Sequence, residues 1–269
     1  MSVGYQLPPL CTSAFSAYVS DALSRKVLIF LPTYNEARNL GNLVRDLRRL
    51  QPAASLLICD DNSPDGTGEV ADELQRTVSD VKVIHRPGKQ GLGTAHVLGM
   101  DRAIAGGYEV LLTMDCDYTH RPEDVSLLID ALAARRVDLV IGSRYQHPDG
   151  LRDWPLWRRA VTRTAHLLTR GLLGIRYDAT NAFRAYQVSA LERVPYHEIR
   201  ADGYSFMFEM VFACVAAGLS IDEVPVELPI RQAGESKISN AEVAKAILSL
   251  LRLSVARLSA QLKPKEARR

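Results

Sequence analysis

Two hydrophobic patterns alternate along the first half of the chain. Residues 27–31 form a continuous apolar run, which is typical of a strand covered on both faces. Apolar residues then recur at positions 40, 43, 44, 47 and 50, the spacing of a helix with one buried face, and Asn35 is its expected N-cap. Further strands are expected at 55–59, 81–84, 109–114 and 138–141, and further helices at 67–77, 94–105 and 122–134. This alternation predicts a mainly parallel, doubly wound α/β sheet.

The pattern changes after residue 141. An arginine-rich helix is expected at 156–173, followed by a loop and short strand at 178–186, a buried helix at 206–217 and a strand at 221–230. Pro225 and Pro229 interrupt this last strand. Because proline cannot donate a backbone hydrogen bond to a neighbouring strand, we expect the strand at an edge of the sheet.

The two ends of the chain differ from this α/β domain, which we place at residues 25–239. Residues 1–24 have mixed polarity and are interpreted as an N-terminal arm. Residues 240–269 predict a long amphipathic helix followed by a basic tail. The apolar face of that helix fits a membrane surface with anionic lipids, but it fits equally well a packing surface on the domain or on another subunit.

Composition excludes several classes of protein. The formal net charge of the 269 residues is +2, too small to indicate nucleic-acid binding. Four scattered cysteines without zinc-ligand spacing are typical of reduced thiols in a cytosolic protein. No signal peptide is evident, and no apolar run approaches the roughly 20 residues of a transmembrane helix. Contact with a membrane would therefore be made from its surface.

Polar loops follow the first four expected strands. They contain Pro32-Thr33-Tyr34-Asn35-Glu36, Asp60-Asp61, a glycine-rich stretch with Lys89, and Asp115-Cys116-Asp117. Parallel strands of an open sheet end at one edge, so these loops are expected to surround a common crevice. The glycines would allow the backbone to approach a ligand closely, although the loop matches no standard phosphate-binding motif.

Asp115 and Asp117 are the strongest candidates for a metal site. They come directly after a strand, one residue apart. Divalent cations that also hold substrate phosphates typically take one or two protein carboxylates. An acidic turn that only caps the following helix is the alternative interpretation.

Two further segments follow the four loops in the sequence: Gly142-Ser143-Arg144-Tyr145 and Gly234-Glu235-Ser236-Lys237. Taken in this order, the six segments resemble the motifs of a known enzyme family. The chain resembles family 2 inverting glycosyltransferases of the GT-A fold, and more closely the polyprenol (dolichol) phosphate mannose synthases. The resemblance implies a Rossmann-like, mainly parallel sheet with flanking helices. It also implies transfer of mannose from GDP-mannose to the phosphate of a polyprenyl lipid, with inversion at the anomeric carbon and with Mg²⁺ or Mn²⁺.

The resemblance assigns roles to individual residues. Asp115 and Asp117 match the metal pair, and Asp117 and Arg144 are the expected catalytic residues. Arg144, Arg158 and Thr162 are expected at the acceptor phosphate, with Arg231 and Lys237 on a loop that closes over the phosphates. The expected nucleotide-sugar site consists of Pro32, Tyr34, Glu36, Cys59, Asp61, Lys89, Asp115, Cys116, Asp117, Thr119, Arg231 and Lys237. Thr119 departs from the family's usual pattern, which leaves the sugar and the nucleotide open.

An acceptor phosphate is already anionic near neutral pH, so the reaction needs positioning more than a general base. An acceptor hydroxyl would need a base, for which Glu209 is the nearest candidate; we favour a structural role for it. A UDP-hexose donor, a soluble acceptor, or an inactive nucleotide-sugar-binding protein are the alternatives. The leading hypothesis places the enzyme in the cytoplasm, peripheral at the cytoplasmic face of a membrane, with its oligomeric state open.

Overall fold

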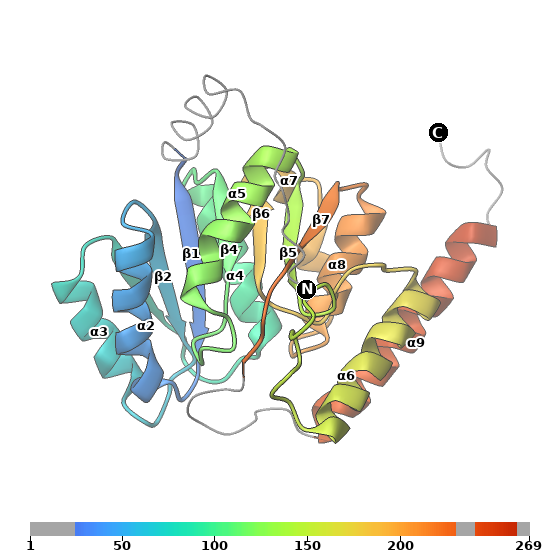
Figure 1. The fold of residues 1–269 in the computed structure, drawn as a ribbon, viewed down its shortest axis with the longest axis horizontal. Helices are drawn as coiled ribbons and strands as arrows, with labels where there is room; N and C mark the ends of the chain where they lie inside the picture. Colours follow the sequence, from blue (N-terminus) through green and yellow to red (C-terminus); the bar gives the residue numbers. More distant parts are fainter. Residues whose placement is uncertain (1–24, 230–239, 263–269) are drawn as a thin grey trace, which may run out of the picture.

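The computed structural model describes residues 25–229 and 240–262, and a seven-stranded sheet forms its centre (Figure 1). The order across the sheet is β3-β2-β1-β4-β6-β5-β7, and only β6 among these strands runs antiparallel to its neighbours. The predicted mainly parallel sheet and the edge position of the last strand are therefore confirmed. The strands are β1 (Val27–Thr33), β2 (Ser55–Asp60), β3 (Val81–His85), β4 (Val110–Thr113), β5 (Leu139–Ser143), β6 (Arg184–Gln187) and β7 (Ile221–Pro225).

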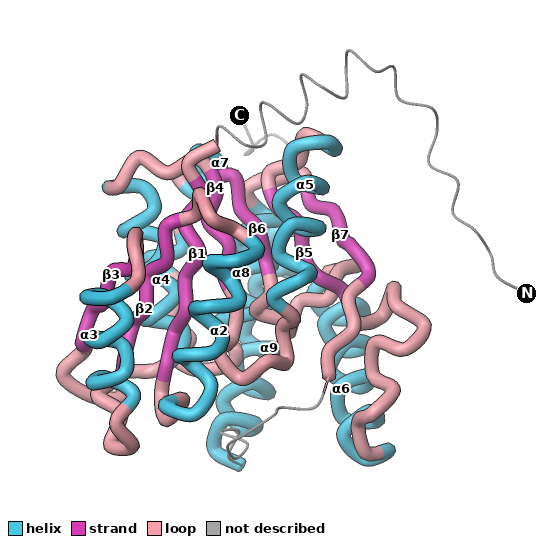
Figure 2. The backbone as a smooth tube through the Cα atoms, turned by 60° about the vertical axis from the view of Figure 1, so that its left-hand side comes forward, coloured by secondary structure: helices cyan, strands magenta, loops and turns pink. Residues whose placement is uncertain are grey.

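Helices cover both faces of the sheet (Figure 2). One layer contains α2 (Ala37–Leu50), α3 (Thr67–Thr77) and, after the short turn η1 (Pro122–Asp124), α5 (Val125–Arg135). The other contains α4 (Leu92–Ala105), α7 (Val188–Leu191), η3 (Tyr196–Glu198) and α8 (Phe206–Ala216). Ile29 and Leu31 belong to the first core, whereas Leu28 and Phe30 belong to the second. Because successive side chains of a strand point to opposite faces, the continuous apolar run of β1 fills both cores.

The start of α2 differs from the prediction. Asn35 has a φ of 58° and lies before the cap position, which Glu36 occupies. The backbone N–H of Ala37 donates to the Asp65 carboxylate at 3.1 Å, and that of Glu36 donates to Thr67 Oγ1 at 2.9 Å. The expectation of Asn35 as N-cap is therefore wrong, because Asp65 and the first residue of α3, Thr67, supply the acceptors instead.

Two elements of the second half are divided or shortened relative to expectation. The expected helix 156–173 consists of α6 (Leu156–Leu168) and a π-helical turn, η2 (Thr169–Leu173), that ends at Gly174 with a φ of 70°. The strand expected at 221–230 ends at Pro225, where β7 pairs with Ser143 of β5.

The last helix, α9 (Asn240–Leu262), packs on the domain with only part of its surface. Leu250 is buried in the second core, and Arg252 forms an ion pair with Glu209 of α8 at 2.6 Å. Leu248, Leu251 and Val255 remain more than half exposed. The helix therefore packs on the domain and still presents an apolar face. Within the described ranges, no helix combines the length and apolar character needed to cross a membrane.

Candidate functional site

The carboxyl ends of β1, β2 and β4 surround a cavity of about 270 Å³. Most residues expected at the nucleotide-sugar site line it: Pro32, Tyr34, Glu36, Asp61, Lys89, Asp115, Cys116 and Asp117. Cys59 and Thr119 each lie two residues from a lining residue, Asp61 and Asp117 respectively, but are not part of the cavity wall. Arg231 and Lys237 lie outside the described residues. The structure therefore brings together the side chains that follow three different strands, as parallel strand ends require.

The turn after β4 is held in an unusual conformation. Tyr118 has a φ of 63°, which is uncommon for a bulky residue. Asp117 accepts hydrogen bonds from the backbone N–H of Thr119 at 3.0 Å and from its hydroxyl at 2.5 Å. The hydroxyl of Tyr118 donates to Asp46 of α2 at 3.0 Å. These contacts hold the turn in its unusual backbone conformation and fix the buried Asp117 carboxylate in the cavity wall.

His120 and Asn181 support Asp115 from behind, a role that the sequence did not reveal. The Asp115 N–H donates to Nδ1 of His120 at 2.8 Å, so the ring proton belongs on Nε2. Nε2 then donates to the side-chain oxygen of Asn181 at 2.8 Å, and the Asn181 amide donates to the Gly142 carbonyl at 2.5 Å. Both side chains are buried, and the His120 ring stacks on Phe183. This chain of hydrogen bonds ties the end of β4 to β5.

Arg86 is a second residue that sequence reasoning missed. Its guanidinium forms an ion pair with Asp61 at 2.9 Å, with both side chains less than a tenth exposed. It also donates to Gln90, to the Gly91 carbonyl and to Thr94. Burial raises the pKa of Asp61, and the charge of Arg86 opposes this effect. Arg86 therefore holds the Lys89 loop against the strand end that carries Asp61.

Lys89 and Tyr34 form the outer wall of the cavity. The Lys89 ammonium lies 4.5 Å from the centre of the Tyr34 ring, a cation–π contact between two loops. Cys59 lies behind them in the second core, where burial raises the pKa of its thiol to about 11. The thiol is therefore neutral at physiological pH.

The glycines of the Lys89 loop allow another segment of the protein, and not only a ligand, to approach closely. Gly91 has a φ of 98°, and a side chain there would collide with the backbone of Asp202. A Cβ on Gly93 would lie 2.6 Å from the carbonyl oxygen of Ala201. The Gly93 N–H instead donates to the Asp202 carbonyl at 2.8 Å. Segment 201–206 therefore packs directly on the start of α4, and Gly203 and Tyr204 from this segment complete the cavity wall.

The Asp115 and Asp117 pair suits a hard divalent cation. Carboxylate oxygens are the ligands that Mg²⁺ and Mn²⁺ prefer, and two of them suffice when substrate phosphates complete the coordination. No cluster of three or more potential ligands occurs in ranges 25–229 and 240–262, so an all-protein metal cage is not formed there. The pair fits a metal that arrives with a diphosphate better than a permanent structural ion.

The residues expected at the acceptor phosphate do not line this cavity. Arg144 is buried and pairs with Asp178 through Nε at 2.8 Å and Nη2 at 3.2 Å. Although burial opposes the charged form, Asp178 chiefly, and Asp115 to a smaller extent, raise the pKa of Arg144. The carboxylate of Asp115 is therefore within electrostatic reach of the Arg144 guanidinium, but Asp178 neutralises much of the positive charge of Arg144.

Arg158 and Thr162 come from the first turns of α6. The Arg158 guanidinium lies 4.0 Å from the centre of the Trp154 ring, which the Trp154 N–H holds in place by donating to Leu228. The Thr162 carbonyl accepts from the Tyr145 hydroxyl at 2.9 Å. The structure thus places Arg144 and Arg158 around Trp154, because both guanidinium groups approach its ring.

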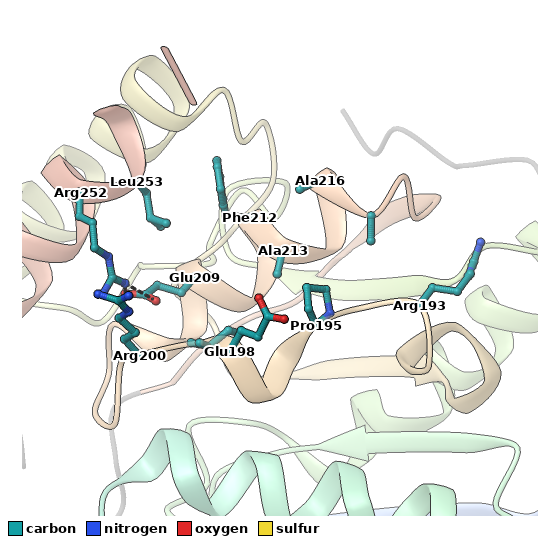
Figure 3. A pocket seen from close by; sticks show the side chains of 12 residues that line it. Arg193, Pro195, Glu198, Arg200, Glu209, Phe212, Ala213, Ala216, Arg252 and Leu253 are labelled. Atoms are coloured by element: carbon teal, nitrogen blue, oxygen red, sulfur yellow. Dashed lines mark hydrogen bonds and ion pairs between the residues drawn. The ribbon is translucent and has the colours of Figure 1, made fainter. Parts of the chain in front are cut away.

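A second cavity of about 410 Å³ lies between η3, α8 and α9, and it explains Glu209 (Figure 3). Glu209 is 3% exposed and accepts hydrogen bonds from Ser249 and Arg252 of α9. Figure 3 shows the side chains of Glu209 and Arg252 meeting at one end of this cavity, with Arg200 beside Arg252. Glu209 is thus a packing residue between helices, as favoured from the sequence, and it does not line the cavity at the strand ends.

Comparison with known proteins establishes the family. The model of glycosyl transferase family 2 matches residues 28–195, more than half of the 269 residues. The chain belongs to glycosyl transferase family 2. This glycosyltransferase is therefore an enzyme, and the resemblance stated from its motifs is confirmed.

Two relatives match most of the glycosyltransferase. It is 40% identical over 230 residues to a polyprenol monophosphomannose synthase of Mycolicibacterium smegmatis, covering 84% of this chain and 86% of the relative. It is 37% identical over 232 residues to an undecaprenyl-phosphate mannosyltransferase of Micrococcus luteus, covering 86% and 95% of the two chains.

Solved structures show the same fold at lower identity. Glucosyl-3-phosphoglycerate synthase of Mycobacterium tuberculosis with Mn²⁺, UDP and phosphoglyceric acid matches the glycosyltransferase with a TM-score of 0.66 and 19% identity, covering 93% of this chain and 84% of that one. Its structure with Mg²⁺ and UDP gives a TM-score of 0.66 at 18% identity, with coverages of 93% and 85%. The expected GT-A architecture is thus confirmed.

Proposed function

We propose that this glycosyltransferase transfers mannose from GDP-mannose to the phosphate of a polyprenyl lipid, with inversion and with a divalent metal. The observation that carries the proposal is the cavity in which Asp115 and Asp117 lie with Tyr34, Asp61 and Lys89. It occurs in a chain that aligns over most of its length with two enzymes named for mannose transfer to polyprenyl phosphates.

In this proposal the loops after β1 and β2 hold the nucleoside. Tyr34 offers a ring face that Lys89 already approaches, and Asp61 offers a buried carboxylate fixed by Arg86. Pro32, Glu36 and Cys59 complete this part, with Cys59 contributing from behind the wall. Lys89 then faces the diphosphate, where its charge attracts the phosphate oxygens.

Asp115 and Asp117 would hold the metal, with Cys116 and Thr119 shaping the turn between and after them. A bound Mg²⁺ or Mn²⁺ would neutralise the charge that develops on the departing diphosphate. Asp117 is buried and held by Thr119, so its carboxylate is positioned before the donor arrives. Such preorganisation is worth more than the same charge on a flexible loop.

The lipid phosphate would approach from the side of Trp154. There Arg144, Arg158 and Thr162 are the proposed acceptor residues, and Arg231 and Lys237, outside the described residues, remain proposed for the donor phosphates. A phosphate oxygen attacks the anomeric carbon as the bond to the diphosphate breaks, so the nucleoside diphosphate leaves with that electron pair. No proton has to be removed from the attacking phosphate, which agrees with the packing role of Glu209.

The decisive assay offers radiolabelled GDP-mannose or UDP-glucose together with polyprenyl phosphate, or with a soluble phosphorylated acceptor, in the presence of Mg²⁺. Label from GDP-mannose in the organic phase supports the proposal. Label only in a water-soluble product, or transfer only from UDP-glucose, would replace it with one of the alternative donors or acceptors. Absence of turnover with both donors would point to a binding protein.

We further propose that α6, η2 and α9 form the face that meets the membrane, at its cytoplasmic side. Fourteen large apolar side chains are exposed in the described residues, and all except Leu127 and Val215 lie on these elements. Leu156, Trp157 and Val161 project from the first turns of α6, close to the proposed acceptor residues. A lipid acceptor would be presented to the enzyme at this face.

Flotation with vesicles tests this face. Replacing Leu248 and Val255 by Asp places two charges where an apolar surface would enter the lipid interface. We expect vesicle binding to fall at least tenfold, because burial of one such side chain is worth about 1.5–3 kcal/mol when complete. Leu127→Asp, an exposed site on α5, is the control and should leave binding unchanged. Equal binding of the double variant and the control would reject α9 as the docking face.

A further inference from the structure

Segment 201–206 completes the donor cavity, and two helices contact it. The start of α4 contacts it through the Gly93 N–H, which donates to the Asp202 carbonyl at 2.8 Å. The first turns of α9 contact it through Glu242 and Lys245. The segment therefore joins α9 to the cavity that contains Asp115 and Asp117.

Among the described residues of α9, it is Glu242 that lines the donor cavity. Its carboxylate accepts a hydrogen bond from the backbone N–H of Tyr204 at 3.1 Å. Gly203 lacks a side chain where a Cβ would collide with this carboxylate. Lys245, one turn later, donates to the Asp202 carboxylate at 3.1 Å.

The rest of α9 is fastened separately. Glu209 of α8 binds Arg252 and Ser249, and the Arg257 guanidinium donates to the Leu172 carbonyl at 3.0 Å. These contacts lie further along the helix than Glu242. Loss of the Glu242 contact would therefore free the Tyr204 backbone N–H without detaching α9.

We propose that Glu242 is a positioning residue for the nucleotide sugar, through which α9 fixes the wall of the donor cavity. The inference rests on the proposed donor site. Glu242 acts through the Tyr204 backbone and not on the reacting bond, so it contributes to donor affinity more than to turnover. Its function needs a hydrogen-bond acceptor at this position and does not need the negative charge, which a diphosphate would in fact repel.

The test compares Glu242→Ala, Glu242→Gln and the control Glu73→Ala in the full-length protein. Glu73 forms an exposed pair with Arg76 on α3, and Figure 1 shows α3 and α9 at opposite edges of the molecule. Binding of GDP and of UDP with Mg²⁺ is measured by calorimetry, and hydrogen exchange is followed in segment 199–206. Donor KM and kcat are then measured with the sugar nucleotide of whichever nucleotide binds.

We expect Glu242→Ala to weaken binding of the nucleotide and raise donor KM roughly tenfold, which corresponds to about 1.4 kcal/mol, with kcat within about twofold. Exchange at Tyr204 should accelerate. Glu242→Gln keeps an acceptor oxygen, so it should bind the nucleotide at least as tightly as the wild type. Glu73→Ala should match the wild type in every measurement.

Faster exchange in Glu242→Ala with unchanged nucleotide affinity would overturn the inference, because Glu242 would then be only a structural contact. A loss of affinity in Glu242→Gln equal to that in Glu242→Ala would also overturn it. If the wild type binds neither nucleotide, the proposed donor site fails and the inference fails with it. If the wild type binds a nucleotide and Glu242→Ala binds it equally tightly, only the inference on Glu242 fails and the proposed donor site stands.

Discussion

Replacing Arg86 by Met removes the buried cation beside Asp61 and tests whether the donor site is built on this pair. The Arg86 and Asp61 side chains are 5% and 9% exposed, and 2.9 Å separates their charged atoms. Removing one partner of a buried ion pair typically costs about 3–5 kcal/mol, because the other charge is left without compensation. Three further hydrogen bonds, to Gln90, Gly91 and Thr94, are lost as well.

The expected loss of stability can be measured by thermal unfolding. A loss of about 4 kcal/mol corresponds to a decrease in Tm of roughly 8–16 °C for a chain of this size. Arg49→Met is the matched control, because Arg49 pairs with Asp46 at the surface with 72% of its side chain exposed. Exposed pairs contribute at most about 1 kcal/mol, so the control should lose no more than roughly 4 °C.

The dependence on pH gives a second measurement of the same pair. Burial already raises the pKa of Asp61, and removing Arg86 removes a charge that lowers it. An acid whose pKa is higher in the folded than in the unfolded state stabilises the protein at low pH, and this contribution is lost as pH rises through the folded pKa. The loss of stability in Arg86→Met, measured as the decrease in Tm from the wild type, should therefore be larger at about pH 8 than at about pH 5. A decrease in Tm below 2 °C, or one independent of pH, would refute the reasoning.

Three further outcomes follow from buried groups. His120→Ala should weaken both transfer and the binding of GDP with Mg²⁺, because the Asp115 N–H and Asn181 lose their common partner; kcat and GDP affinity measure the two effects. Burial lowers the pKa of His96 to about 3, so its stabilising contribution is present above its unfolded pKa of about 6.5 and is lost as pH falls; urea unfolding of His96→Leu should show a flatter decline between these values than the wild type. Burial raises the pKa of the Cys214 thiol to about 12, so iodoacetamide at pH 8 should label it only after unfolding, as mass spectrometry would detect.

Hydrophobic periodicity predicted the sheet well because β1, β2 and β4 are buried on both faces and therefore need continuous apolar runs. The strand ends likewise followed from chain order, because parallel strands finish at one edge. Helix ends were less predictable where a distant loop supplies the cap. Asp65 in the next loop and Thr67 at the start of α3 cap α2, and the local sequence around Asn35 carries no sign of them.

The missed site residues share a different cause. Arg86, His120 and Asn181 belong to no recognisable motif, and they act through partners far away in the sequence, Asp61 for Arg86 and Asn181 for His120. Arg86 precedes the glycine-rich loop of Lys89 without belonging to a motif, although its partners Asp61 and Thr94 lie just after β2 and on α4. Similarly, the pattern of α9 left membrane and packing surfaces equally open, because the helix has apolar residues around much of its circumference. In the structure, the burial of Leu250 and the ion pair between Arg252 and Glu209 show which side packs inward.

The charges around the donor cavity add a physical reason for the proposed metal. Five carboxylates line it in the described residues, but Lys89 is the one Lys or Arg among those lining residues, and Arg86 behind the wall balances Asp61. The carboxylates belong to Glu36, Asp61, Asp115, Asp117 and Glu242. A diphosphate entering this cavity would meet an excess of negative charge unless cations enter with it. Because charges in a partly buried cavity interact more strongly than in water, a divalent ion on Asp115 and Asp117 would turn repulsion into attraction. Nucleotide affinity should therefore depend steeply on Mg²⁺ or Mn²⁺ even before any sugar is transferred.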